Sequence, residues 1–249
     1  MVTPTPSPLL SFVETQLQSL PGDVSTDAAI AKNTAFLRAL AANEAPRRLI
    51  EEILANSDLR SRIASRSYRH ANNFDKILLL DNGQPDGYRL SIHHWYSGHG
   101  EPVTADEPIH NHRFSFWSHI FRGTMSASVY VESDRAGEGG APFPRYKYLP
   151  TSTGNVHTCK YDGETHLKRV ESVTYLPGDV YYLNYRVLHR VHAPGYGQTL
   201  CTLVLRGPRE REYAETYNSS YPRNGIAYNT PVMDAGQLRA VLTRILDEP

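Results

Sequence analysis

The stretch that decides the fold is Pro108-Ile109-His110-Asn111-His112, in which one residue separates two histidines. We expect it to open a strand that runs from His110 to Phe121. Because side chains two positions apart on a strand point to the same face, His110 and His112 can direct two imidazoles to one point. Imidazole nitrogens bind divalent metal ions at about 2.0–2.1 Å. The spacing therefore predicts a metal site.

A third histidine follows a second distinctive stretch. Pro177-Gly178-Asp179 is a turn signal that starts a strand, and the next strand carries Leu188-His189-Arg190-Val191. His192 lies three residues after His189, so the two side chains face opposite ways on a strand. Only one of the two can therefore join the other two histidines, and the family resemblance described below favours His189.

The surrounding sequence has a mainly β pattern. Short extended runs separated by Gly, Pro and Asp predict an all-β barrel or sandwich. We expect strands at residues 74–80, 88–95, 110–121, 125–131, 145–149, 156–161, 168–175, 180–184, 188–193 and 199–206. Residues 1–70 show helical spacing of apolar side chains, and 208–249 form an extension with a final helix capped by Asp234. We expect one structural domain whose barrel covers 71–207.

The two histidine stretches resemble the two sequence motifs of the cupin superfamily. The residues that carry the resemblance are Gly98-His99-Gly100, His110, His112, Gly123, Pro177-Gly178 and His189. The resemblance covers residues 74–207. It implies a double-stranded β-helix, or jelly-roll, barrel, to which this chain adds an N-terminal helical segment and a C-terminal helix.

One expected cupin ligand is missing. The glutamate of the first motif should fall at Phe116 or Trp117, and neither is a carboxylate. Three histidines without a carboxylate resemble the cysteine dioxygenase branch of the cupins. Four strings in the same order add to that likeness: Leu90-Ser91-Ile92-His93-His94-Trp95, Ile109-His110-Asn111-His112, Leu188-His189-Arg190-Val191 and Leu203-Val204-Leu205-Arg206-Gly207-Pro208. This resemblance implies Fe(2+) on the three histidines, although three imidazoles also suit other divalent metals.

The chain departs from that branch beside the metal. Many of its members cross-link a cysteine to a tyrosine, and here those positions are Trp117 and Arg206. We expect Arg206 and Tyr182 to be the catalytic residues. Strand alternation requires either Tyr181 or Tyr182 to face inward, and a phenol near the metal could donate a hydrogen bond in place of the missing tyrosine.

The substrate-binding arginine of the branch has no secure match. Lys76 is near its place and Arg89 is a second option, so we expect these two residues to bind substrate. Phe116 and Trp117 are expected to line the substrate site.

Three other polar residues receive structural interpretations. Arg113 follows the second ligand, so on a strand its side chain would point away from the metal face. His157 and His166 are interpreted as surface residues.

The resemblance implies a mononuclear non-haem iron(II) oxygenase that uses dioxygen to oxidise a small metal-chelating substrate with a thiol, amino or carboxylate group. The alternatives are another metal-dependent cupin enzyme, such as an isomerase or lyase, and a cupin that binds a metal or ligand without turnover. The pattern His-x-Asp/Glu of 2-oxoglutarate oxygenases is absent, because residue 112 is histidine.

The composition gives no sign of a macromolecular partner. The 249 residues contain 26 basic and 26 acidic side chains, so neither nucleic acid nor a membrane surface is expected to bind. Two cysteines are too few for a disulfide framework. The N-terminus does not resemble a signal peptide, so we expect a cytoplasmic protein, and the added helices could support a homodimer.

Overall fold

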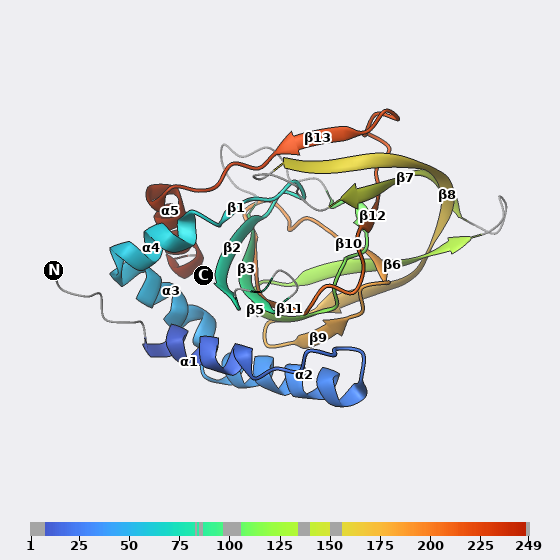
Figure 1. Ribbon diagram of the computed structural model, residues 1–249. Helices are drawn as coiled ribbons and strands as arrows, with labels where there is room; N and C mark the ends of the chain where they lie inside the picture. Colours follow the sequence, from blue (N-terminus) through green and yellow to red (C-terminus); the bar gives the residue numbers. More distant parts are fainter. Residues whose placement is uncertain are drawn as a thin grey trace.

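Two antiparallel sheets face each other and enclose the interior of a jelly-roll barrel in the computed structural model (Figure 1). The structure describes residues 8–82, 84, 87–96, 106–133, 140–149 and 156–247. The expectation of a mainly β barrel with helices at both ends is confirmed. The expected Gly98-His99-Gly100 turn lies outside the described residues.

The first sheet has six strands. Their spatial order is β1 (Tyr68–Arg69), β2 (Asp75–Asp81), β3 (Arg89–Tyr96), β11 (Thr199–Arg206), β5 (Phe116–Arg122) and β9 (Val180–Leu183). Side chains alternate across this sheet, as its pleat requires. On β2, Ile77 and Leu79 are fully buried on the outer face, whereas Lys76 faces the barrel interior.

The second sheet has seven strands. Their spatial order is β13 (Ile226–Asn229), β8 (Val156–Tyr175), β6 (Met125–Ser133), β10 (Leu188–Val191), β4 (Ile109–His110), β12 (Ala214–Tyr217) and β7 (Ala141–Leu149). Strand β8 also pairs with β7, so the sheet curls round on itself. The expectation of two strands at 156–161 and 168–175 is wrong, because β7 pairs with residues 164–167 and continues the ladder between them.

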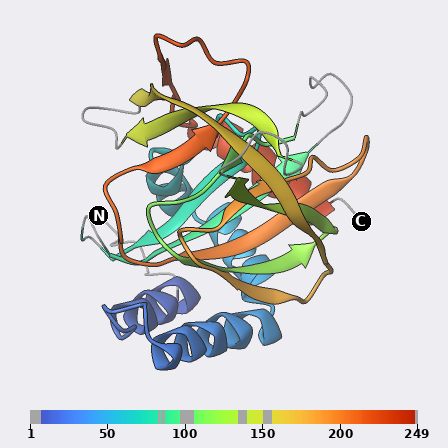
Figure 2. The same cartoon turned by 90° about the vertical axis from the view of Figure 1, so that its right-hand side faces the viewer.

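Helices cover the outer face of the first sheet, where they lie beside and beneath it in Figure 1; in Figure 2 the two blue N-terminal helices remain beneath the barrel, and the other helices lie behind its strands. They are α1 (Pro8–Gln18), α2 (Asp27–Ala42), α3 (Ala45–Ala55), α4 (Ser57–Ala64) and α5 (Ala235–Asp247). Thr26 caps α2 by accepting a hydrogen bond from the Ala29 amide. The C-terminal helix begins as expected, with the Asp234 carboxylate accepting from the Gln237 amide at 2.7 Å.

Buried apolar side chains join these helices to the sheet. Leu37 of α2, Leu49 of α3 and Leu242 of α5 belong to the same core cluster as Leu90 and Leu203 of the barrel. The helical segment is therefore part of the hydrophobic core rather than a loose appendage. None of the helices in the described part of the chain is both long and apolar enough to cross a membrane.

Candidate metal centre

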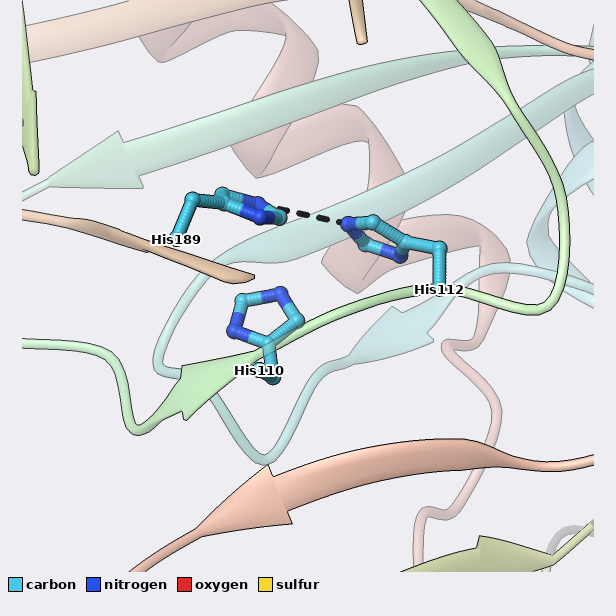
Figure 3. A group of neighbouring side chains, drawn as sticks. All are labelled: His110, His112 and His189. Carbon is cyan, nitrogen blue, oxygen red and sulfur yellow. Dashed lines mark hydrogen bonds between the residues drawn. The ribbon is translucent and has the colours of Figure 1, made fainter. Parts of the chain in front are cut away.

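Three histidines from two adjacent strands and the following bend meet inside the barrel (Figure 3). His110 ends β4, His189 lies on β10, and the two are directly paired across the ladder. His112 lies beyond the end of β4. One ring nitrogen from each histidine lies within 4.8 Å of the others, so the three side chains could hold one ion.

The convergence of His110 and His112 has a different cause from the one expected. The predicted strand from His110 to Phe121 is wrong, because β4 ends at His110 in the second sheet and β5 begins at Phe116 in the first. Between them the chain crosses from one sheet to the other. The His112 amide donates to the Tyr185 carbonyl oxygen at 3.1 Å, which fixes the bend that turns this side chain toward its partners.

Hydrogen bonds orient two of the imidazoles. His110 Nδ1 lies 2.8 Å from the Pro108 carbonyl oxygen, and His189 Nδ1 lies 3.2 Å from the Val187 carbonyl oxygen. A carbonyl accepts only, so each Nδ1 carries the proton and each Nε2 keeps its lone pair for a metal. The Nε2 atoms of His112 and His189 are 3.3 Å apart, a separation that suits two ligands of one ion.

Burial keeps this cluster uncharged. It lowers the pKa of His110, and it lowers the pKa of His189 to about 3. Burial and the two neighbouring imidazoles hold the pKa of His112 well below its ordinary value. Neutral imidazole is the form that binds metal. The donor set therefore fits a divalent transition metal at neutral pH.

Glu107 is a site residue that the sequence analysis missed. Its carboxylate is 5% exposed, accepts a hydrogen bond from Trp95 Nε1 at 3.2 Å, and lies 3.8 Å from His110 Nε2. Burial raises the pKa of Glu107 to about 8. The cupin resemblance led us to expect a carboxylate after the histidine pair, where none is present, whereas Glu107 precedes His110 by three residues. An acidic residue just before His-x-His was the available signal.

The histidines open onto a cavity of about 240 Å³ between the two sheets. Aromatic side chains form much of its lining: Phe74, Trp95, Phe114, Phe116, Tyr148 and Tyr181. The centroids of the Phe116 and His112 rings are 5.0 Å apart, so Phe116 lies beside the histidine cluster. This aromatic part of the lining favours an organic ligand.

Three basic residues predicted for the site, Lys76 and Arg89 as substrate-binding residues and Arg206 as a catalytic residue, also line this cavity. Burial and the nearby arginines lower the pKa of Lys76 to about 7. Arg206 is 7% exposed, and burial lowers its pKa to about 9. Arg89 forms a 2.8 Å ion pair with Asp81, which leaves it less available than the other two.

Two predicted site residues lie outside the cavity lining. Trp117 is fully buried on the outer face of β5, where its Nε1 donates to the Ile30 carbonyl oxygen of α2 at 3.2 Å. Tyr182 packs against Trp117 on that same side, with ring centroids 5.1 Å apart. Tyr181 is therefore the tyrosine that faces inward, because alternation on β9 allows only one of the pair to do so.

Two residues that were interpreted as structural or surface groups line the cavity instead. Arg113 follows the end of β4, so the alternation that would have turned it outward does not apply. His157 is 8% exposed, and its Nε2 lies 2.9 Å from Thr230 Oγ1. His157 is buried because β13 pairs with β8 beside it, through Tyr228.

The glycines of the two motifs have local backbone roles. Gly123 has a φ of 72°, and a Cβ there would lie 2.0 Å from the Thr199 carbonyl oxygen, so a side chain is excluded. Gly178 has a φ of 97°, and its amide donates to the Ile120 carbonyl oxygen at 2.8 Å. The turn at Pro177-Gly178 is thus hydrogen-bonded to β5, the strand that pairs with β9.

Comparison with known proteins finds similarity at the level of structure only. No protein-family model matches the sequence, and no curated protein matches it. Among solved structures, one reported with DMSP lyases has a TM-score of 0.29 and 11% identity over 54% of this chain, which spans 47% of that chain. An RmlC-like cupin family protein from Methanocaldococcus jannaschii has a TM-score of 0.30 and 13% identity over 57% of this chain and 86% of that one.

A variant of Bacillus subtilis oxalate decarboxylase has a TM-score of 0.35 and 14% identity, over 63% of this chain and 31% of that chain. A hydroquinone 1,2-dioxygenase in complex with Cd2+ and 4-hydroxybenzonitrile has a TM-score of 0.31 and 13% identity, over 53% of this chain and 62% of that one. Similarity at this level does not identify a function. The case for a metal centre rests on the geometry of His110, His112 and His189.

Proposed function

We propose that the protein is a mononuclear non-haem iron(II) oxygenase of the cysteine dioxygenase-like cupin type, which acts with dioxygen on a small metal-chelating organic substrate. The observation that carries the proposal is the meeting of His110, His112 and His189 in a buried, largely aromatic cavity. Three neutral ligands leave about three positions of an octahedral ion open, enough for a chelating substrate and dioxygen.

Bound iron(II) would supply the electron transfer to dioxygen that organic side chains cannot. The chain's own residues have distinct tasks around it. Phe116 and Tyr181 exclude water from the space beside His112 and His189. Lys76 and Arg206 attract and orient an anionic substrate. Glu107 can hold or accept a proton beside His110.

Glu107 also favours a second candidate, a metal-dependent lyase or isomerase. Such reactions need a proton acceptor or donor next to the metal-bound substrate. Glu107 is buried, is fixed by Trp95, and has no Lys or Arg partner among the described residues. A carboxylate in that state is suited to proton transfer. In this reaction dioxygen would not be consumed.

The two candidates separate in one set of measurements. The protein is purified without oxygen, its metal content is determined, and dioxygen uptake and substrate loss are followed with panels of thiols, amino acids and carboxylates. Bound iron with substrate-dependent dioxygen uptake supports the oxygenase. Substrate loss without dioxygen supports the lyase or isomerase, and bound metal without turnover supports a binding protein.

A matched pair of variants tests the ligands. His112→Ala should abolish metal binding, whereas His192→Ala should keep it, because the His192 ring contacts Asp106 and Ser128 outside the cluster. Unchanged metal content in His112→Ala would refute the proposed centre.

A further inference from the structure

Three cations gather in the wall of the cavity, and we call Lys76, Arg113 and Arg206 the cationic end. Among the described residues, Arg206 donates to neutral acceptors alone, the carbonyl oxygens of Gly87 at 2.9 Å and Gly207 at 3.1 Å. Arg113 Nη1 is buried and has no hydrogen-bond partner within the described part of the chain. Lys76 Nζ lies 6.0 Å above the Tyr68 ring, and none of the ion pairs among the described residues includes it.

The charges around the cationic end do not neutralise it. Arg89 stands next to Arg206 on the neighbouring strand and is already bridged to Asp81. Two other carboxylates line the cavity, and both already have partners: Glu107 contacts Trp95 and His110 at the metal centre, and Glu215 accepts from Asn111 and pairs with Arg211. Buried cations without counter-ions are costly, and such clusters persist where an anionic ligand completes them. The described residues therefore leave positive charge for a ligand to balance.

Aromatic rings lie against and around the cationic end. Arg206 stacks on the Phe114 ring, with its guanidinium carbon 4.8 Å from the centroid. The phenol rings of Tyr68 and Tyr148 line the same cavity. Guanidinium groups bind planar or tetrahedral oxyanions through two parallel hydrogen bonds. A single carboxylate would pair with one guanidinium group. Three cations instead match an anionic group that carries more than one negative charge.

We infer that the cationic end binds an oxyanion with two negative charges, carried by the substrate on a different group from the one that binds the metal. Phosphate monoesters and dicarboxylates share this chemistry. Identifying the bound molecule as the substrate rests on the proposed function, but the anion site itself does not require the metal.

The test uses the full chain freed of metal by a chelator. Calorimetric titrations with inorganic phosphate, phthalate and benzoate near pH 7, where the metal-free protein still holds much of the Lys76 proton, compare two anions that can carry two charges with a monoanion. We expect at least one dianion to bind on the order of ten times more tightly than benzoate, as an added charge-assisted hydrogen bond would give. Preference for phosphate indicates a phosphate monoester, and preference for phthalate indicates a dicarboxylate. Benzoate binding as tightly as both dianions would overturn the inference.

Variants locate the site. Lys76→Met and Arg113→Met should each weaken binding of the preferred dianion roughly 10- to 100-fold, whereas Lys168→Met, on the exposed side of β8, should not change it. If Arg113→Met does not fold, Arg113→Lys keeps the charge but loses the planar fork, and it should still bind more weakly. Unchanged binding in the Lys76 and Arg113 variants overturns the inference. Loss of metal binding with intact anion binding overturns only the proposed function.

Discussion

Replacing Lys76 by methionine should stabilise the metal-free protein while it weakens anion binding. Methionine keeps much of the length of the side chain and removes its charge. Burial and the repulsion from Arg206, Arg89 and Arg113 lower the pKa of Lys76 from 10.5 to about 7. At roughly 1.4 kcal/mol for each pKa unit, this corresponds to about 5 kcal/mol. Water in the cavity screens part of it, so we expect a gain of about 2–4 kcal/mol at neutral pH.

The gain should depend on pH in a defined direction. The unfolded chain keeps Lys76 protonated up to about pH 10.5, whereas the folded protein releases the proton above about pH 7. Between these values the unfolded state binds more protons, so the wild-type protein gains stability as pH rises and the variant lacks that contribution. The difference in free energy of unfolding between the variant and the wild type is therefore largest below about pH 7 and falls to zero toward pH 10.5.

Urea unfolding of both proteins near pH 6.5 and near pH 9.5 measures the difference directly. Groups that titrate equally in both proteins cancel in the comparison. Lys168→Met, an exposed change on β8, serves as the control and should alter stability by less than about 0.5 kcal/mol. The reasoning fails if Lys76→Met is less stable than the wild type at both pH values, or if the gap between them does not narrow at the higher pH.

Three further outcomes are expected. Metal at about 100 times its Kd should stabilise the wild-type protein by about 2.7 kcal/mol, a rise in Tm of roughly 5–11 °C, and thermal melts of His189→Ala should show no such rise. Trp117→Phe should lower the free energy of unfolding by about 1–3 kcal/mol but leave the affinity for phosphate or phthalate unchanged, because the ring lies outside the cavity; an altered affinity contradicts that placement. Tyr88→Phe removes hydrogen bonds to Pro21 and Asn33 that join the helices to the barrel, so urea unfolding should show a loss of about 1–3 kcal/mol, and no loss means that these contacts do not hold the helices.

Part of the site was predictable because it depends on residue type and local spacing. His110, His112 and His189 were identified from two short stretches, and the structure brings them together. The pleat of a strand also predicted that only one of two adjacent residues faces inward. Which of the two faces inward depends on which face of the sheet the helices cover, and that depends on contacts between residues far apart in the sequence. Tyr181 and Phe116 face the cavity because Tyr182 and Trp117 pack toward α2.

The mainly β pattern, the helical ends and the three candidate ligands could all be predicted from the amino-acid order, because they depend on local hydrophobic periodicity and on residue type. The end of β4 at His110 could be learned only from the tertiary structure. Because β4 ends at His110, His112 lies in a bend where its amide donates to the Tyr185 carbonyl oxygen, and Arg113 faces the cavity. Both placements depend on how the chain crosses between the two sheets, and the spacing of residues along the chain does not specify that crossing.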